Sequence, residues 1–268
     1  MKTKLLLLCF LFFGLQAFPQ TRKVKRAIKA LDKEKFEKAE KLLYKSLDKD
    51  SINAAAHYGL SLLFIHNNFD GYNIDVSYDH INTAIAQYDS LKEGEKLLKK
   101  LGKIGIVDSS LSNQKEYVQE LAFNHVYKTN TIEAYDYFIE NYDDASQVAK
   151  AVQLRNEIAY EEARKANTYD AYKYFIDTYP DASQIAEASE LYEFLLYENK
   201  TKSRTLDSYI SFLKEYPHTN YTVDALKNIF ELYTIDHQPE SYVKFVKDFP
   251  QNDSITKKAV GFLYHLVK

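Results

Sequence analysis

A short segment with fixed aromatic spacing occurs four times in the second half of the chain. Each copy carries large apolar residues at relative positions 0, 3, 4 and 7, counted from Tyr135, Tyr172, Tyr209 and Tyr242. Residues three and four apart share one face of an α-helix, whereas a half-buried strand would require alternation. The spacing therefore predicts a helix in each copy. The offsets of 37, 37 and 33 residues predict a repeat architecture.

The same signals for a helix end and a new helix follow each copy. Pro180, Pro217 and Pro250 follow the last aromatic residue in three copies, and Asp143 takes this place in the first. Proline disfavours a helical conformation in the residue before it, so the first helix should end there. An N-cap residue and, five positions later, an alanine are expected to mark a closely packed second helix: Ser146 and Ala151, Ser183 and Ala188, Asn220 and Ala225, Ser254 and Ala259.

A capping signal marks the start of the first helix in three of the copies. Thr131, Thr168 and Thr205 can each cap a helix, and an acidic residue two positions later suits the positive end of the helix dipole. The expected fold is all-α, a right-handed solenoid of stacked helical hairpins in which each unit contacts its neighbours. We expect this array over residues 112–268, in about four units of 33–37 residues, beginning with a lone second helix near Ser112.

The preceding residues are expected to be helical as well, with a different repeat type. Residues 21–70 should form N-terminal hairpins, with one helix beginning at Phe36 and the next over residues 54–65. We expect residues 67–72 to form a loop. A helical connector is expected over residues 71–111, with one long helix at 78–100.

The first twenty residues have the layout of a secretory signal peptide. Lys2 and Lys4 precede an apolar run of nine residues that is too short to span a bilayer. Cleavage is expected after Ala17 or near Gln20, and the alternative is a buried N-terminal helix. Because Cys9 is the single cysteine, the mature chain would have neither a disulfide nor a cysteine-ligated metal. We expect an exported protein, periplasmic or secreted, with outer-membrane association as an alternative, and no transmembrane segment in the mature chain.

The motif is clearest over residues 172–183, which read Tyr-Lys-Tyr-Phe-Ile-Asp-Thr-Tyr-Pro-Asp-Ala-Ser. It resembles the tetratricopeptide-like (TPR) repeats of bacterial cell-envelope proteins. Similar repeats occur in the outer-membrane assembly lipoprotein and in the periplasmic coordinator of the Tol–Pal system. The resemblance covers residues 112–268, with a looser match over residues 25–70, and implies a helical-repeat fold.

The sequence offers few groups for catalysis. No pair among the seven histidines has the i, i+4 spacing of a helical zinc site, and no glycine-rich phosphate loop occurs. The Ser-x-x-Lys matches at Ser211 and Ser241 are explained by helices whose intervening residues form the core. We therefore expect no enzyme, no catalytic residue, no cofactor and no metal. The formal net charge of −3 also argues against nucleic acid as a partner.

The leading functional hypothesis is a non-catalytic scaffold that binds a protein or peptide. Tyr137 and Tyr174 precede the stripe phenylalanine at equivalent positions and are candidate partner-binding residues; the alternative is partial burial against a neighbouring unit. Phe262 and Leu266 in the last helix are expected to be partly exposed, for a partner or a homodimer. The other functional readings are an accessory subunit of outer-membrane assembly or secretion machinery, and a cell-wall hydrolase.

Overall fold

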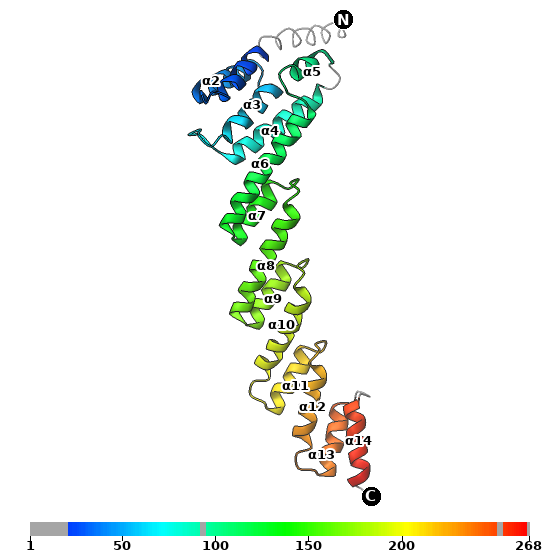
Figure 1. Ribbon diagram of the computed structural model, residues 1–268. Coiled ribbons are helices and arrows are strands. Elements are labelled where there is room, and N and C mark those ends of the chain that lie inside the picture. The colour runs from blue at the N-terminus through cyan, green and yellow to red at the C-terminus, as the bar shows by residue number, and fades with distance from the viewer. Residues whose placement is uncertain (1–20, 92–94, 251–253, 267–268) are drawn as a thin grey trace. The chain divides into compact units, whose positions relative to one another are not determined.

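All secondary structure that the computed structural model describes is helical (Figure 1). The described residues are 21–91, 95–250 and 254–266, so the expected signal peptide at 1–20 lies outside them. The predicted all-α class is confirmed for these residues. The chain divides into two compact units, Met1–Val152 and Gln153–Lys268, each of which is described by itself.

The first unit is a series of helices that pack on their neighbours in the sequence. After a helical segment at residues 21–31, these are α2 (Phe36–Leu47), α3 (Ala54–Phe64), α4 (Ile74–Ser90), α5 (Glu95–Gly102), α6 (Asp108–Thr129) and α7 (Ile132–Asn141). Helix α3 packs on α2 and α4, and α6 packs on α4 and α7. The helices expected from Phe36 and over residues 54–65 are therefore present, as is the non-helical segment at 67–72.

The single long helix expected at residues 78–100 is wrong. Helix α4 begins earlier, because the Asn73 side chain accepts a hydrogen bond from the Val76 N–H at 3.1 Å and caps it. It ends at Ser90, where the Leu91 N–H donates to the Tyr88 carbonyl at 3.0 Å and tightens the last turn. Helix α5 is a separate element. Helix α6 also begins before residue 112, since the Ser110 hydroxyl accepts from the Val107 N–H at 2.9 Å.

The second unit consists mainly of paired helices. Its elements are most of α8 (Val148–Ala166), then α9 (Tyr169–Thr178), α10 (Ile185–Lys200), α11 (Leu206–Glu215), α12 (Thr222–Tyr233), α13 (Pro239–Asp248) and α14 (Ser254–Leu266). Helix α9 packs on α10, α11 on α12 and α13 on α14. These pairs are the predicted first and second helices of the repeat.

Threonine side chains cap three of the first helices, as predicted. Thr131, Thr168 and Thr205 accept the backbone N–H three residues later at 3.2, 3.2 and 3.3 Å. The residue before each threonine has a left-handed backbone, with φ values of 52°, 48° and 53° at Asn130, Asn167 and Arg204. The chain thus passes from one helix to the next within two residues at α6–α7 and α8–α9, and within five residues at α10–α11.

The predicted caps of the second helices are wrong at Ser183 and Asn220. Helices α10 and α12 begin after Gln184 and Tyr221, and neither cap residue makes a side-chain bond. The turn is closed by backbone instead: the Ile185 N–H donates to the Ala182 carbonyl at 3.2 Å. Helix α8 likewise begins two residues after Ser146, at Val148, and Ser254 is itself the first residue of α14. The predicted alanines are confirmed as close-packing positions, since each is 0% exposed: Ala151, Ala188, Ala225 and Ala259.

One aromatic contact recurs between each second helix and the first helix that follows it. The ring centroids are 5.5, 5.5, 5.2 and 5.2 Å apart in the pairs Phe123–Phe138, Tyr160–Phe175, Tyr197–Phe212 and Phe230–Phe245. The ring planes meet at 66°, 60°, 77° and 73°; three of the pairs are edge-to-face, a favourable arrangement, and Tyr160–Phe175 is tilted. We name these four contacts the aromatic clasps.

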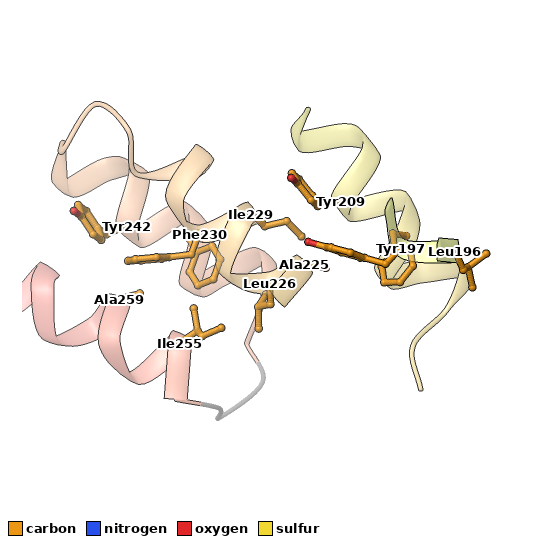
Figure 2. Packing of buried hydrophobic residues seen from close by; sticks show 12 residues of the cluster. Leu196, Tyr197, Tyr209, Ala225, Leu226, Ile229, Phe230, Tyr242, Ile255 and Ala259 are labelled. Atoms are coloured by element: carbon orange, nitrogen blue, oxygen red, sulfur yellow. The ribbon is translucent and has the colours of Figure 1, made fainter. Parts of the chain in front are cut away.

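The clasps of the second unit lie in a continuous apolar core. Tyr197, Phe212, Phe230 and Phe245 belong to one buried cluster, to which α14 contributes Ile255 and Ala259 (Figure 2). The last stripe residues Tyr216 and Phe249 are only partly buried against this cluster. The aromatic residues therefore hold successive helices together rather than forming a ligand cage.

Replacing a clasp residue should strongly destabilise the chain. Phe212 is 1% exposed and contacts both Tyr197 and Tyr216. Phe212→Ala should lower the free energy of unfolding by about 3–5 kcal/mol, through lost burial and a cavity. Urea denaturation followed by circular dichroism measures this. The exposed neighbour Ser211 provides the control Ser211→Ala, and a loss below about 1 kcal/mol for Phe212→Ala would contradict the role of the clasp.

Removing a threonine cap should have a smaller effect. Thr168→Ala leaves the Ala171 N–H without its side-chain acceptor and should cost about 1 kcal/mol of unfolding free energy. Thr178→Ala makes the same chemical change at an exposed position at the other end of α9 and should change the stability by less than about 0.5 kcal/mol. Equal effects of the two substitutions would show that the cap contributes nothing specific.

Candidate partner-binding site

Tyr137 lies on α7 beside the buried aromatic stripe but is not part of it. Its side chain is 45% exposed, whereas Tyr135 and Phe138 on the same helix are 0% exposed. Tyr137 borders a hollow of about 390 Å³ in the first unit. We call this feature the Tyr137 hollow.

The start of α4 and the consecutive helices α6 and α7 form the Tyr137 hollow. At the start of α4 the lining includes Tyr72, the cap residue Asn73, and Ile74 and Asp75 of the first turn. The last two turns of α6 and helix α7 with its C-cap contribute the rest of the lining: Ala122, His125, Val126, Thr129, Ala134, Tyr137 and Tyr142. The lining therefore combines aromatic rings, apolar groups and the polar side chains of Asn73, His125 and Thr129 with a single carboxylate among the described residues that line it.

Asp75 is the centre of the hydrogen bonding in the hollow. The Tyr142 hydroxyl donates to Asp75 Oδ1. Burial, together with this hydrogen bond, raises the pKa of Tyr142 far above its usual range. Partial burial and a hydrogen bond with the same carboxylate also raise the pKa of Tyr137. Both phenols are therefore neutral at physiological pH, and they leave the negative charge of Asp75 in place.

A second phenol–carboxylate contact lies next to the hollow. The Tyr78 hydroxyl donates to Asp144 at 2.6 Å, and Gln119 Nε2 donates to the same oxygen at 2.6 Å. Lys115 forms an ion pair with Asp144. Burial opposes ionisation of Asp144, but the hydrogen bonds from Lys115 and Tyr78 lower the pKa of this carboxyl below its usual value. This carboxylate is therefore neutralised by a lysine, unlike Asp75.

The two contacts together tie α4 to the end of α7. The rings of Tyr78 and Tyr142 lie 4.5 Å apart between centroids, and their hydroxyls bind Asp144 and Asp75 respectively. Asp144 follows α7 at the point where the other copies of the motif carry the residue after proline. The first copy has thus exchanged proline for acidic residues, one of which is bonded to two other helices.

The other candidate residues lie elsewhere. Tyr174 is 67% exposed on α9 in the second unit. Phe262 on α14 is 44% exposed while its ring contacts Tyr242 at 5.9 Å, so the expected partial exposure is confirmed for it. Leu266 is the last residue of α14, and its side chain lies outside the described part of the chain. A shallow hollow of about 520 Å³ lies beside α13 and α14 and includes Val243, Lys244 and Leu263.

His57 and His80 form a partly buried pair of histidines on α3 and α4. His57 Nε2 lies 3.0 Å from the Ser51 carbonyl, which can only accept, so this nitrogen carries the proton. His57 Nδ1 lies 2.9 Å from His80 Nδ1, so one of these two nitrogens donates to the other. Burial, and secondly the proximity of His57, lower the pKa of His80 to about 4. The ring of His80 also stacks on Phe64 at 5.7 Å, and we interpret the pair as a hydrogen-bonded link between α3 and α4.

No group of three or more histidine, cysteine or acidic side chains in residues 21–91, 95–250 and 254–266 is arranged to hold a metal ion. Within the same ranges, no helix has both the length and the apolar character needed to cross a bilayer.

Only one lining residue of the hollow was predicted as a site residue. The sequence singles out Tyr137 because it directly precedes the stripe phenylalanine of its copy, off the apolar stripe. Tyr72, Asp75 and His125 carry no local signal, since they come from a loop, a helix start and a helix end that only tertiary packing brings together. Comparisons of the chain with protein-family models, with curated proteins and with solved structures give no match.

The histidine pair should make the stability of the chain depend on pH. The pKa of His80 is about 4 in the folded protein against 6.5 for an unperturbed histidine, so the unfolded chain binds more protons between these values. The free energy of unfolding should therefore fall as the pH is lowered from 6.5 to about 4. Urea denaturation at a series of pH values measures this slope.

Substitution of the histidine should flatten the slope. His80→Leu should make the fall between pH 6.5 and 4 shallower than in the unsubstituted chain, because one of the titrating groups is gone. His218 is exposed, and His218→Leu should leave the slope unchanged. A slope that is the same in both variants would contradict the assignment to His80.

Proposed function

We propose that this protein is a non-catalytic scaffold that binds a protein or peptide partner in the bacterial cell envelope. The proposal includes stacking of its helix pairs into a right-handed solenoid of the TPR-like type. Support comes from the repeated threonine caps, close-packed alanines and aromatic clasps, which are features of a repeat in which each unit packs on its neighbours. Repeat proteins of this kind present long surfaces for association.

The observation that carries the proposal is the contrast between two sets of tyrosines. Framework tyrosines such as Tyr135 and Tyr172 are at most 1% exposed, whereas Tyr137 and Tyr174, two residues further along the same helices, are 45% and 67% exposed. Tyrosine is favoured at protein interfaces because a large ring and a hydroxyl can both contact a partner. Of the two, Tyr137 also borders a hollow that could receive a side chain.

The cellular location is proposed from the first twenty residues. Their two lysines and short apolar run are typical of a secretory signal, so the partner would be a protein or peptide of the periplasm or the outer membrane. The charge balance of the chain, with 35 basic and 38 acidic side chains, gives it no general attraction for nucleic acid.

Site-specific photo-cross-linking tests the proposal. A benzophenone amino acid at position 137 should give a discrete cross-linked product in envelope extracts, identified by mass spectrometry, because Tyr137 borders the hollow. The same probe at position 127 is the matched control, since Tyr127 is 53% exposed on α6 and lies outside the lining. Identical cross-linking patterns from the two positions, or none from position 137, would contradict a partner-binding role for this surface.

A further inference from the structure

We propose that the Tyr137 hollow recognises a basic side chain, lysine or arginine, in an extended segment of the partner. This inference rests on the proposed function, because it assigns the chemistry of the same surface. It follows from three properties of the hollow: its aromatic lining, its uncompensated negative charge and its size.

The aromatic lining suits an organic cation. Tyr72 and Tyr137 are 39% and 45% exposed at the hollow, and Tyr142 lies in its buried part. A cation near the face of a tyrosine ring is attracted by the ring quadrupole, and the aliphatic part of a lysine or arginine side chain can cover apolar surface at the same time. The chain itself uses this interaction next to the hollow, where Lys115 Nζ lies 5.4 Å from the centroid of the Tyr78 ring.

The charge of the hollow is negative. Asp75 accepts from the neutral phenols of Tyr142 and Tyr137, so its charge is solvated by hydrogen bonds but not neutralised. Asp79, one turn further along α4, is close enough to act electrostatically on Tyr137. Lysine and arginine do not occur among the described residues of the lining, and Lys115 is engaged by the other carboxylate, Asp144.

The alternatives fit the hollow less well. An acidic side chain would meet Asp75 without a compensating cation. A purely apolar side chain would contact the rings but would leave the exposed carboxylate of Asp75 facing it, which costs free energy when water is displaced. A lysine or arginine side chain supplies apolar length, a positive charge and several N–H donors, and the volume of about 390 Å³ accommodates such a side chain together with adjoining backbone.

An NMR titration of the ¹⁵N-labelled full chain tests the inference. The probes are blocked pentapeptides with a single varied residue between glycines: lysine, arginine, acetyl-lysine and glutamate. The lysine and arginine peptides should shift the backbone resonances of Tyr72, Asp75 and Tyr137, with a Kd in the range of about 1 mM. Acetyl-lysine keeps the length but removes the charge, so its peptide should bind about tenfold more weakly or not at all.

Two variants locate the effect and a third serves as a matched control. Asp75→Asn retains an oxygen acceptor for Tyr142 but removes the charge, and Tyr137→Leu removes the ring; each should weaken the binding of the lysine peptide about three- to tenfold. Tyr174→Leu changes the equivalent residue of the next copy and should have no effect. If Asp75→Asn perturbs the fold, as judged by its NMR spectrum, the comparison of Tyr137→Leu with Tyr174→Leu decides.

The outcomes separate this inference from the proposed function. Equal binding of the lysine and acetyl-lysine peptides, preferential binding of the glutamate peptide, or the absence of shifts at the hollow would overturn the recognition of a cation. A cross-linked partner at position 137 together with any of these results would leave the scaffold proposal intact. Selective binding of the lysine and arginine peptides, lost in Asp75→Asn or Tyr137→Leu, would confirm the inference.

Discussion

Each aromatic clasp joins a helix to the one that follows it, and the remaining features of the repeat make this contact possible. A left-handed residue and then a capping threonine precede the next helix, here Arg204 and Thr205, and the chain reverses within a few residues, which brings Tyr197 against Phe212. An edge-to-face pair contributes about 0.5–1.5 kcal/mol beyond the burial of its surface. Because the contact is local in sequence, the same geometry recurs wherever the spacing recurs, as in Phe230 and Phe245.

The first copy of the motif departs from the others at its end, and the candidate site lies there. Asp143 takes the place of the proline after the last aromatic, and the following Asp144 is held by Tyr78, Gln119 and Lys115. The tyrosine that ends the stripe, Tyr142, bonds to Asp75 at the start of α4. A framework position has thereby acquired polar partners from a helix outside the regular repeat, and these partners frame the Tyr137 hollow.

Charge distinguishes the two carboxylates of this region. Asp144 has a lysine partner, which lowers its pKa, and so serves as a link between helices. Asp75 has neutral phenols as partners and keeps its charge at the edge of an aromatic hollow. The same residue type thus stabilises the fold at one position and, in our proposal, selects the charge of a partner at the other.

The sequence by itself determined the helical class, the position of the first helices, their threonine caps and the buried alanines, because these depend on neighbours within a few residues. It misplaced the caps of the second helices, where backbone hydrogen bonds such as Ile185 to Ala182 replace a side chain, and it merged α4 with α5. Tyr137 could be singled out from the repeat, but its surroundings could not. Only the tertiary structure brought Tyr72 and Asp75 to it, since packing of α4, α6 and α7 depends on contacts between residues more than sixty positions apart, such as Tyr142 and Asp75.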